Sequence, residues 1–275
     1  MPEKPEVMTV AKALDKRILH RTITGCNVYW DNIIAQPSVS TFKEKIVGQT
    51  IQSIKTRGKF IVIELDQDSL LIHLRMEGKF LFRKLTDAKG KHEHVELILD
   101  RDTSFRYHDV RKFGKMYLVP KEETYGTKPL KDLGPEFDDK ELTGSYLLKK
   151  FQKRQQPIKT TLLDQRIIAG IGNIYDDEIL FKSRIHPLQE SCSLKIGECN
   201  RIVDNTKEVL SHAVELGGTT IRSFTSSEGV HGLFQNELQI HGKKICPLCG
   251  TDVTKIMVNG RGTYFCKKCQ KLKKK

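Results

Sequence analysis

The chain has 275 residues, 38% hydrophobic and 29% charged, as expected of a folded protein long enough for two domains. Its 47 Lys and Arg against 34 Asp and Glu leave a formal charge of +13, which favours a polyanionic partner, either nucleic acid or an anionic membrane surface, over a generically basic surface. No run approaches the roughly 18 apolar residues of a membrane span, and the N-terminal segment lacks the apolar stretch of a secretory signal, so we expect neither.

The first 119 residues predict a helix followed by short strands. The helix is expected over about 6–19, where apolar residues recur at helical spacing at Val7, Val10, Ala11, Leu14 and Ile18. Strands are expected at 51–55, 59–65, 70–74, 79–82, 95–99 and 116–119. Their regular spacing favours a β-sandwich or barrel.

Residues 120–137 contain several prolines and glycines and predict an interdomain linker. Helices are expected after it, at 139–155, 157–165, 175–182 and 197–216, the last one ending at Gly217-Gly218. The segment 217–242 is polar and interrupted by glycine, which is typical of a long functional loop.

Four cysteines near the C-terminus have the spacing of a metal site. Cys246 and Cys249 form one C-x2-C pair, and Cys266 and Cys269 form a second after sixteen intervening residues. Two such pairs suit one tetrahedral zinc with four thiolates, which leaves no position for water and predicts a structural ion. The alternative, two disulfides, would need an oxidising compartment that nothing else indicates. Three further cysteines are interpreted as reduced thiols of a cytosolic protein.

The segment around these cysteines is strongly basic. Residues 243–275 contain ten Lys and Arg and one Asp. A basic zinc hairpin is suited to contact nucleic acid. On its own, this feature is equally typical of a ribosomal or transcription protein.

Seven short motifs occur along the chain. They are Pro2-Glu3-x-Pro5-Glu6-Val7, Arg57-Gly58-Lys59, His73-Leu-Arg-Met76-Glu-Gly, Asp109-Val-Arg111-Lys-Phe113-Gly, Gly170-Ile-Gly-Asn173-Ile-Tyr175-x-Asp-Glu178, Gln235-Asn-Glu237-Leu and Gly260-Arg261-Gly-Thr-x-Phe265-Cys266. In this order, and over essentially the whole chain, they resemble the formamidopyrimidine-DNA glycosylase family.

The resemblance implies an α+β multidomain fold. The N-terminal domain would be a β-sandwich flanked by helices. A helical domain with a helix–two-turn–helix motif would follow, with a four-cysteine zinc-finger β-hairpin, and DNA would lie between the domains. The corresponding boundaries are 1–132, 133–242 and 243–275, with a lesion-capping loop at about 217–237.

The resemblance also implies an unusual nucleophile. Pro2 alone would be interpreted as the start of a helix. If Met1 is removed, however, Pro2 presents a secondary amine, and an α-amine has a pKa of about 8, so a useful fraction is neutral. Attack on the sugar C1′ would expel the base. The resulting iminium keeps its charge and can accept electrons during β- and δ-elimination of the flanking phosphates.

Other residues near Pro2 receive roles from the same resemblance. Glu3 would be the general acid that protonates the opening sugar ring. Lys59 would reach a phosphate beside the lesion and assist catalysis. Glu6 either orients the amine or is a solvated carboxylate at a helix start. Two positions depart from the family pattern, Lys4 in place of an apolar residue and Met8 in place of a glutamate, and Lys4 is expected to depress the pKa of the amine.

The remaining candidates are DNA contacts. His73, Asn173 and Arg261 would bind phosphates, although His73 alone would be interpreted as a core histidine. Met76 and Phe113 would fill the gap left by a flipped nucleotide, and Arg111 would bond the widowed base. His94 and Tyr175 are further candidates at the DNA surface.

The predicted protein is therefore a bifunctional glycosylase and abasic-site lyase for oxidised purines such as 8-oxoguanine and formamidopyrimidines. We expect a monomer acting on duplex DNA in the cytoplasm, associated with the nucleoid, with one structural zinc and no membrane partner. Two alternatives stay open: an endonuclease VIII-type enzyme for oxidised pyrimidines, and a catalytically silent relative that binds damaged DNA.

Overall fold

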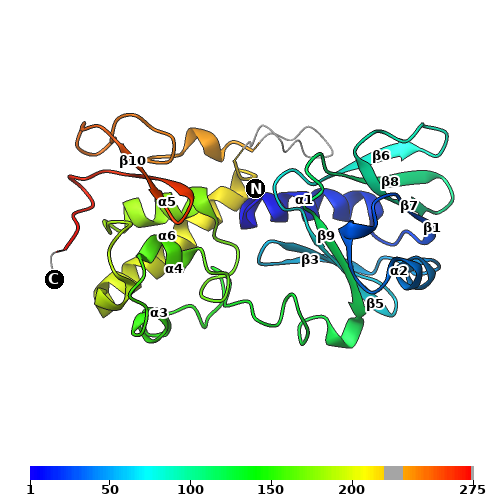
Figure 1. The fold of residues 1–275 in the computed structure, drawn as a ribbon, viewed down its shortest axis with the longest axis horizontal. Coiled ribbons are helices and arrows are strands. Elements are labelled where there is room, and N and C mark those ends of the chain that lie inside the picture. The colour runs from blue at the N-terminus through cyan, green and yellow to red at the C-terminus, as the bar shows by residue number, and fades with distance from the viewer. Residues whose placement is uncertain (220–231, 274–275) are drawn as a thin grey trace. The chain divides into compact units, whose positions relative to one another are not determined.

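The computed structural model describes residues 1–219 and 232–273, and these form two compact units. The first unit contains Met1–Lys131 and the described residues of Gly217–Gly232, and the second contains Asp132–Leu216 and Leu233–Lys275 (Figure 1). A few residues after the longest helix therefore belong to the first unit, although the chain on both sides of them belongs to the second.

Two sheets and two helices make up most of the first unit. In chain order its elements are α1 (Lys4–Ile18), β1 (Ile23–Val28), β2 (Ile34–Gln36), α2 (Val39–Ile46), β3 (Ser53–Arg57), β4 (Phe60–Glu64), β5 (Asp68–His73), β6 (Lys79–Lys84), β7 (Glu93–Leu99), β8 (Thr103–His108) and β9 (Lys115–Pro120). The sheets have the strand orders β1-β7-β8-β6 and β2-β9-β5-β4-β3. The β2–β9 pair is parallel and the other pairs are antiparallel.

One apolar core contains side chains from both sheets and from both helices of this unit. From α1 it includes Val7, Leu14 and Ile18, which recur at helical spacing on one face. Phe42 of α2 joins the same core. A sandwich flanked by helices, as predicted, follows from this arrangement.

Several elements of the first unit were absent from the sequence prediction. It omitted β1, β2, α2 and β8. In β8, Arg106 is only 3% exposed, because it forms ion pairs with Glu93 at 2.9 Å and Glu96 at 3.0 Å. Arg106 lies between Phe105 and Tyr107, which belong to the apolar core, so it lies on the opposite face of the strand and is buried there by its two ion pairs.

The second unit combines helices with a C-terminal hairpin. Its elements are α3 (Gly144–Phe151), α4 (Ile158–Leu162), α5 (Asn173–Lys182), α6 (Ile196–Glu215), β10 (Thr254–Val258) and β11 (Arg261–Phe265). The β10–β11 hairpin lies beside α5, which also packs against α6 (Figure 1). The helix predicted at 139–155 was too long: α3 begins only after Thr143, whose side chain caps it by accepting a hydrogen bond from Tyr146 N at 3.1 Å.

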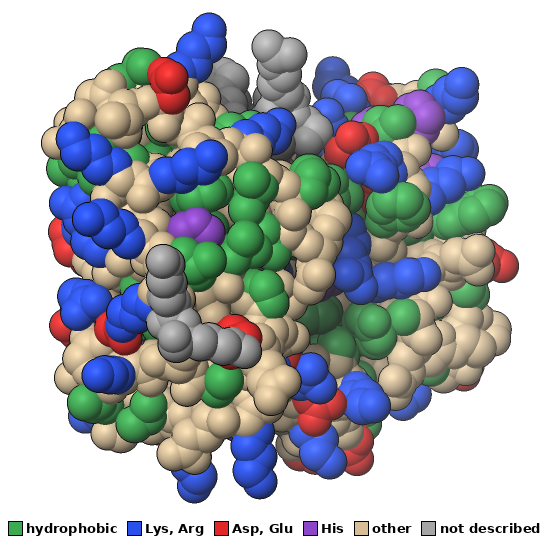
Figure 2. Space-filling view, turned by 60° about the vertical axis from the view of Figure 1, so that its left-hand side comes forward, with side chains coloured by type: hydrophobic (Ala, Val, Ile, Leu, Met, Phe, Trp, Pro, Cys, Tyr) green, Lys and Arg blue, Asp and Glu red, His purple; other side chains and the backbone are tan. Residues whose placement is uncertain are grey.

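The predicted fold class, an α+β chain with N-terminal sheets, a helical region and a four-cysteine hairpin, is confirmed. Figure 2 shows Lys and Arg side chains spread over the visible face, with fewer Asp and Glu among them. Within the described part of the chain, no helix combines the length and apolar character needed to span a bilayer.

Candidate functional site

The N-terminal turn is buried and tied to two other segments of the first unit. Pro2 and Glu3 are buried just before α1, and Glu3 N donates a hydrogen bond to Glu6 Oε2 at 2.9 Å. The other oxygen, Glu6 Oε1, accepts from Thr219 N at 2.7 Å and from Thr219 Oγ1 at 3.1 Å. Glu6 is 1% exposed, so it is not a solvated carboxylate. It joins the N-terminal turn to Thr219, at the start of the predicted capping loop, whose residues 220–231 lie outside the described part.

The same turn contacts the β3–β4 hairpin through a buried lysine. Lys4 is 3% exposed, and its Nζ donates to Thr56 Oγ1 at 2.7 Å. Two residues later the chain turns at Gly58, whose φ of 55° suits glycine. Lys59 follows in this turn and is itself buried. The contact therefore brings Pro2 and Glu3 close to the hairpin that carries Lys59.

His73 lies on the strand next to this hairpin. It pairs with Phe60 across β4 and β5, and the two rings meet edge to face with their centroids 4.7 Å apart. His73 Nδ1 accepts a hydrogen bond from Arg75 N at 3.0 Å, which leaves the proton on Nε2. Burial, together with the charges of Arg75 and Lys59, lowers the pKa of His73 to about 3. The imidazole is therefore neutral at physiological pH and can donate from Nε2 without titrating.

Two turns of the first unit meet at the Tyr107 hydroxyl. A Cβ on Gly114 would lie 1.7 Å from this oxygen, and a Cβ on Gly78 would lie 2.3 Å from it. Both positions therefore exclude any larger residue. This junction brings the turn that carries Met76 next to the loop 109–114.

A buried carboxylate shapes the loop 109–114. Asp109 is fully buried: its Oδ1 accepts from Arg111 N at 3.0 Å, and its Oδ2 accepts from Gly114 N at 2.8 Å and from the Tyr107 hydroxyl at 3.3 Å. His94 Nε2 lies 2.8 Å from the Asp109 carbonyl oxygen. By contrast, the Arg111 and Phe113 side chains are exposed and lie against each other, with Arg111 Cζ 4.7 Å from the ring centroid.

In the second unit, the start of α5 contacts the β10–β11 hairpin. Asn173 is the first residue of α5, and its Nδ2 donates to the Gly262 carbonyl at 2.8 Å. Gly262 follows Arg261, the exposed first residue of β11, so the structure brings Asn173 and Arg261 together. Tyr175 is fully buried, with its ring 5.4 Å from that of Phe234, and does not reach the surface.

Two buried carboxylates of α5 fasten the C-terminal segment to the helices, Asp177 at the hairpin and Glu178 at residues 239–241 before it. Asp177 Oδ1 accepts from Lys159 Nζ at 2.7 Å, and its Oδ2 accepts from His241 Nδ1 at 2.7 Å and from Tyr264 N at 3.1 Å. Glu178 accepts from three successive backbone amides, residues 239–241, at 2.8–3.0 Å. Burial raises the pKa of Glu178, although these amides favour its ionised form.

The four cysteines meet at one point at the base of the hairpin. Their Sγ atoms all lie within 4.8 Å of one another, with Cys246 and Cys269 at 3.9 Å and Cys249 and Cys266 at 3.5 Å. Four thiolates around a zinc with bonds of about 2.3 Å would lie about 3.8 Å apart, so the spacing fits a tetrahedral ion.

Comparison with known proteins agrees with this geometry. Residues 1–116 match the formamidopyrimidine-DNA glycosylase N-terminal domain, residues 133–225 match its H2TH domain, and residues 243–272 match a zinc finger found in FPG and IleRS. The Bacillus cereus (strain ATCC 10987 / NRS 248) formamidopyrimidine-DNA glycosylase is 45% identical over 98% of this chain and 99% of its own length. The chain belongs to the formamidopyrimidine-DNA glycosylase family.

Solved structures of the family are also similar. The complex of Lactococcus lactis Fpg with an abasic-site-containing DNA is 37% identical, with a TM-score of 0.91 over 98% of this chain and 99% of that one. The complex of the wild-type L. lactis Fpg with an oxidised-pyrimidine-containing DNA is 36% identical, with a TM-score of 0.91 over 98% of this chain and 100% of that one. As a member of this family, the chain is a DNA glycosylase, and its C-terminal cysteines form a site for one structural zinc.

Several residues that shape this glycosylase site were not assigned a role from the sequence. Asp109, Asp177 and Glu178 belong to the sequence motifs but had no function of their own, and Thr219 was equally unassigned. An Asp two residues before Arg111 and five before a glycine is a recognisable turn signal. Nothing local in the sequence indicates the contact between Glu6 and Thr219, because 213 positions separate them.

Proposed function

We propose that this glycosylase removes oxidised purines from duplex DNA and then cuts the strand through a Schiff base on Pro2. The observation that carries the proposal is the buried N-terminal turn, in which Pro2 and Glu3 lie beside the Lys59 hairpin and Glu6 holds the turn in place. A purely structural helix start has no need of this many buried charged groups.

The proposed chemistry begins after removal of Met1. The Pro2 nitrogen attacks C1′ of the damaged nucleotide, and the bond from C1′ to the base breaks. Opening of the sugar ring gives an iminium between Pro2 and C1′. Loss of a proton from C2′ then expels the 3′ phosphate, and a second elimination expels the 5′ phosphate. Glu3 protonates the sugar-ring oxygen as the ring opens.

Lys4 directly follows the N-terminal turn, and Lys59 lies in the hairpin that Lys4 contacts. Lys59 is proposed to bind the phosphate beside the lesion. Lys4, held by Thr56, is proposed to lower the pKa of the Pro2 amine, because a nearby like charge disfavours the protonated form. The lower pKa favours a neutral nucleophile near neutral pH.

DNA binding is proposed to use both units. In the first unit, neutral His73 donates to a phosphate, while Met76, Phe113 and Arg111 enter the gap left by the flipped nucleotide. His94 is buried against the Asp109 carbonyl, so its contribution to DNA binding would act through the loop.

In the second unit, Asn173 and Arg261 are proposed as phosphate ligands at the start of α5. Tyr175 is fully buried, so it would act only by supporting α5. The charge of +13 supports a polyanionic partner, and duplex DNA as substrate supports a cytoplasmic, nucleoid-associated enzyme, which is proposed to act as a monomer.

Borohydride reduction tests the nucleophile. Processed enzyme mixed with abasic DNA and borohydride should give a covalent adduct, and peptide mapping should place it on Pro2. An adduct on a lysine would contradict the mechanism, and enzyme that retains Met1 should give none. A Glu3→Gln variant should lose base removal but keep most strand cutting at a preformed abasic site, because only base removal starts from a closed sugar.

The opposite base tests Arg111. Cytosine offers the acceptors O2 and N3 to a guanidinium, whereas adenine offers N1 beside an amino group that opposes it. A poorly paired charge-assisted hydrogen bond costs about 1–3 kcal/mol, which corresponds to roughly tenfold to a hundredfold in rate. We expect faster excision of 8-oxoguanine opposite C than opposite A, and an Arg111→Ala variant should flatten this preference. Equal wild-type rates would remove the role given to Arg111.

One observation favours a second substrate class. One relative, the L. lactis Fpg, forms a complex with an oxidised-pyrimidine-containing DNA. A panel of duplexes, each carrying one defined lesion, separates the two classes. Faster turnover of oxidised pyrimidines than of oxidised purines would place the chain with the endonuclease VIII type instead, and absence of turnover on all lesions would leave a silent DNA-binding relative.

A further inference from the structure

The chain's single tryptophan contacts the loop that carries Arg111 and Phe113. Lys112 Nζ lies 3.7 Å from the centroid of the Trp30 ring, the shortest cation–ring distance among the described residues. An ammonium over the face of an indole is attracted by the negative potential of the ring. Trp30 therefore holds the side chain that stands between Arg111 and Phe113 in sequence.

The topology of the sheet explains why these segments meet. The short strand β2 runs parallel to β9, with Ile34 opposite Met116. The residues just before each strand therefore lie side by side, and Lys115 Nζ donates to the Asn32 carbonyl. Trp30 lies as many residues before Ile34 as Lys112 lies before Met116, so the two side chains come to the same level beside the sheet.

Lys112 needs support because its backbone is strained. Its φ is 58°, in the left-handed region that a lysine rarely adopts. Asp109 fixes the amides of Arg111 and Gly114 with its carboxylate, but the Lys112 amide makes only a 3.4 Å contact with the Asp109 carbonyl. The indole provides a side-chain contact at the strained residue itself.

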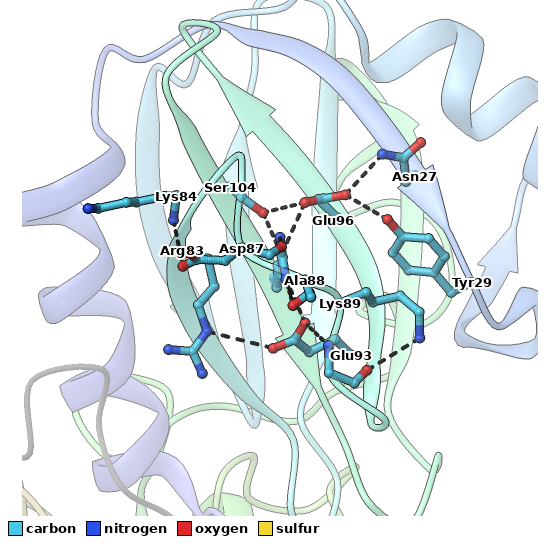
Figure 3. Close-up of polar contacts among 12 residues, drawn as sticks. Asn27, Tyr29, Arg83, Lys84, Asp87, Ala88, Lys89, Glu93, Glu96 and Ser104 are labelled. Carbon is cyan, nitrogen blue, oxygen red and sulfur yellow. Dashed lines mark hydrogen bonds and ion pairs between the residues drawn. The ribbon is translucent and has the colours of Figure 1, made fainter.

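The residue before Trp30, Tyr29, is anchored to the sheet. Tyr29 N donates to the His94 carbonyl at 2.8 Å, and the Tyr29 hydroxyl donates to Glu96 Oε2 at 2.7 Å. Figure 3 shows the Tyr29 hydroxyl and Asn27 pointing at Glu96, with Ser104 on its other side. Arg106 also contacts Glu96, at 3.0 Å. This network fixes the backbone of Tyr29, and so it holds the neighbouring Trp30 in place beside the loop.

We propose that Trp30 is a positioning residue for the strand-inserting loop. Its ring holds Lys112 in the left-handed conformation, which keeps Arg111 and Phe113 at the orientation needed to fill the gap opposite the widowed base. The proposal rests on the proposed role of Arg111 in recognising the opposite base. Loss of the indole leaves the loop folded around Asp109 but lets its tip move, so opposite-base discrimination falls.

The contact itself is tested without DNA. Trp30 is the only tryptophan, so the intrinsic emission of the full-length protein reports on its surroundings. Removing the ammonium with Lys112→Gln should change the intensity or wavelength of that emission, whereas Lys140→Gln, an exposed lysine of the other unit, should not. Identical emission in wild type and Lys112→Gln would overturn the proposal, whatever the enzyme excises.

The function of the contact is tested by a double-mutant cycle. The ratio of kcat/KM for 8-oxoguanine opposite C to that opposite A should fall about threefold to fivefold in Trp30→Leu, the size expected for one cation–π contact. Trp30→Phe keeps an aromatic face and should retain most of the ratio. In a Lys112→Gln background, Trp30→Leu should have no further effect. The control Tyr125→Leu removes an aromatic that is half exposed on the same unit and should leave the ratio unchanged.

The outcomes separate this proposal from the proposed function. Equal wild-type rates opposite C and A would refute the role of Arg111 and with it the basis of the proposal. A wild-type preference that survives in Trp30→Leu, or additive losses in the double variant, would overturn the Trp30 proposal alone. Lys112→Gln could also lower the affinity for duplex DNA equally with C and with A opposite the lesion. If that loss is the same with and without Trp30→Leu, Lys112 contacts phosphate instead, and the Trp30 proposal is overturned.

Discussion

The two units hold their surface loops in different ways. In the first unit, Asp109 fixes a loop by hydrogen bonds, and the loop stands on a large apolar core shared by two sheets and two helices. The C-terminal hairpin has only a small apolar cluster, made of Phe181, Ile240 and two of the cysteines, with a few partly buried neighbours. A scaffold with a large core can hold a loop with one carboxylate, whereas a short hairpin needs a metal ion.

Removing the zinc should have the largest effect. Binding of a structural zinc contributes on the order of 10 kcal/mol to small zinc domains, so Cys249→Ser or chelation should unfold the hairpin. Duplex affinity should then fall by a factor on the order of 100, because the basic hairpin residues lose their phosphate contacts. Metal analysis and binding titrations measure both effects. Cys192→Ser, outside the cluster, should retain zinc and duplex affinity. Undiminished duplex affinity without zinc would show that the hairpin does not need a metal ion.

Removing the Asp109 carboxylate from the first unit should have a smaller, local effect. Asp109→Ala leaves buried donors without their acceptor and should lower the free energy of unfolding of the first unit by about 3 kcal/mol. Denaturant unfolding followed by the emission of Trp30, which lies in that unit, measures this change. Asp87→Ala removes an exposed Asp that accepts from Lys84 N and should cost much less. An equal cost for both would show that burial of Asp109 is unimportant.

Acid should destabilise the first unit through His73. Its pKa of about 3 in the folded state lies below the value of about 6.5 expected when unfolded, so only the unfolded state binds a proton between these values. The contribution of neutral His73 is complete above about pH 6.5 and is lost as the pH falls toward 3, by at most about 1.4 kcal/mol per pH unit. Unfolding of His73→Gln should show a flatter pH dependence in this range, whereas the exposed His20→Asn should keep the wild-type slope.

A second acidic transition of the same unit should appear at lower pH. Although burial opposes it, hydrogen bonds from Ser104, Asn27 and Tyr29 and the charge of Arg106 lower the pKa of Glu96 to about 2. Its stabilising contribution is present above about pH 4.3 and is lost as the pH falls toward 2. Glu96→Gln should therefore reduce the slope that persists in His73→Gln below pH 4. Part of that slope should remain, because the pKa values of Glu64 and Asp100 in the same unit are also lowered. Although burial opposes the shift at Glu64, the hydrogen bonds and charges of Lys55 at Glu64 and of Arg21 at Asp100 lower these pKa values.

The smallest predicted effect concerns one phosphate contact of the hairpin. If Arg261 binds a phosphate, Arg261→Gln should reduce the slope of log affinity against log salt by about one, since about one fewer counterion is released. Lys140→Gln, at an exposed position of the same unit outside the hairpin, should leave the slope unchanged. An unchanged slope in Arg261→Gln would exclude a phosphate contact at this residue.

The sequence by itself determined the features that depend on local spacing. Two C-x2-C pairs identify a zinc site because each pair needs only its own turn to present two thiolates. The periodicity of α1 and α6 was readable because one helix face repeats every three to four residues. By contrast, β1, β2 and β8 were missed, since short or polar strands carry little periodicity of their own. The start of α3 at Gly144 does have a local sign, the N-cap residue Thr143, which the predicted helix at 139–155 overlooked.

Tertiary structure alone decided which polar residues are buried together. Glu6 meets Thr219 and Lys4 meets Thr56, and each pair is separated by more than fifty positions. From the sequence, the charged members of these pairs would be expected in solvent, because Lys and Glu are almost never buried without a partner. Only the pairing of distant strands and the packing of α1 bring those partners into reach, and that is why the support of the site became visible only in the fold.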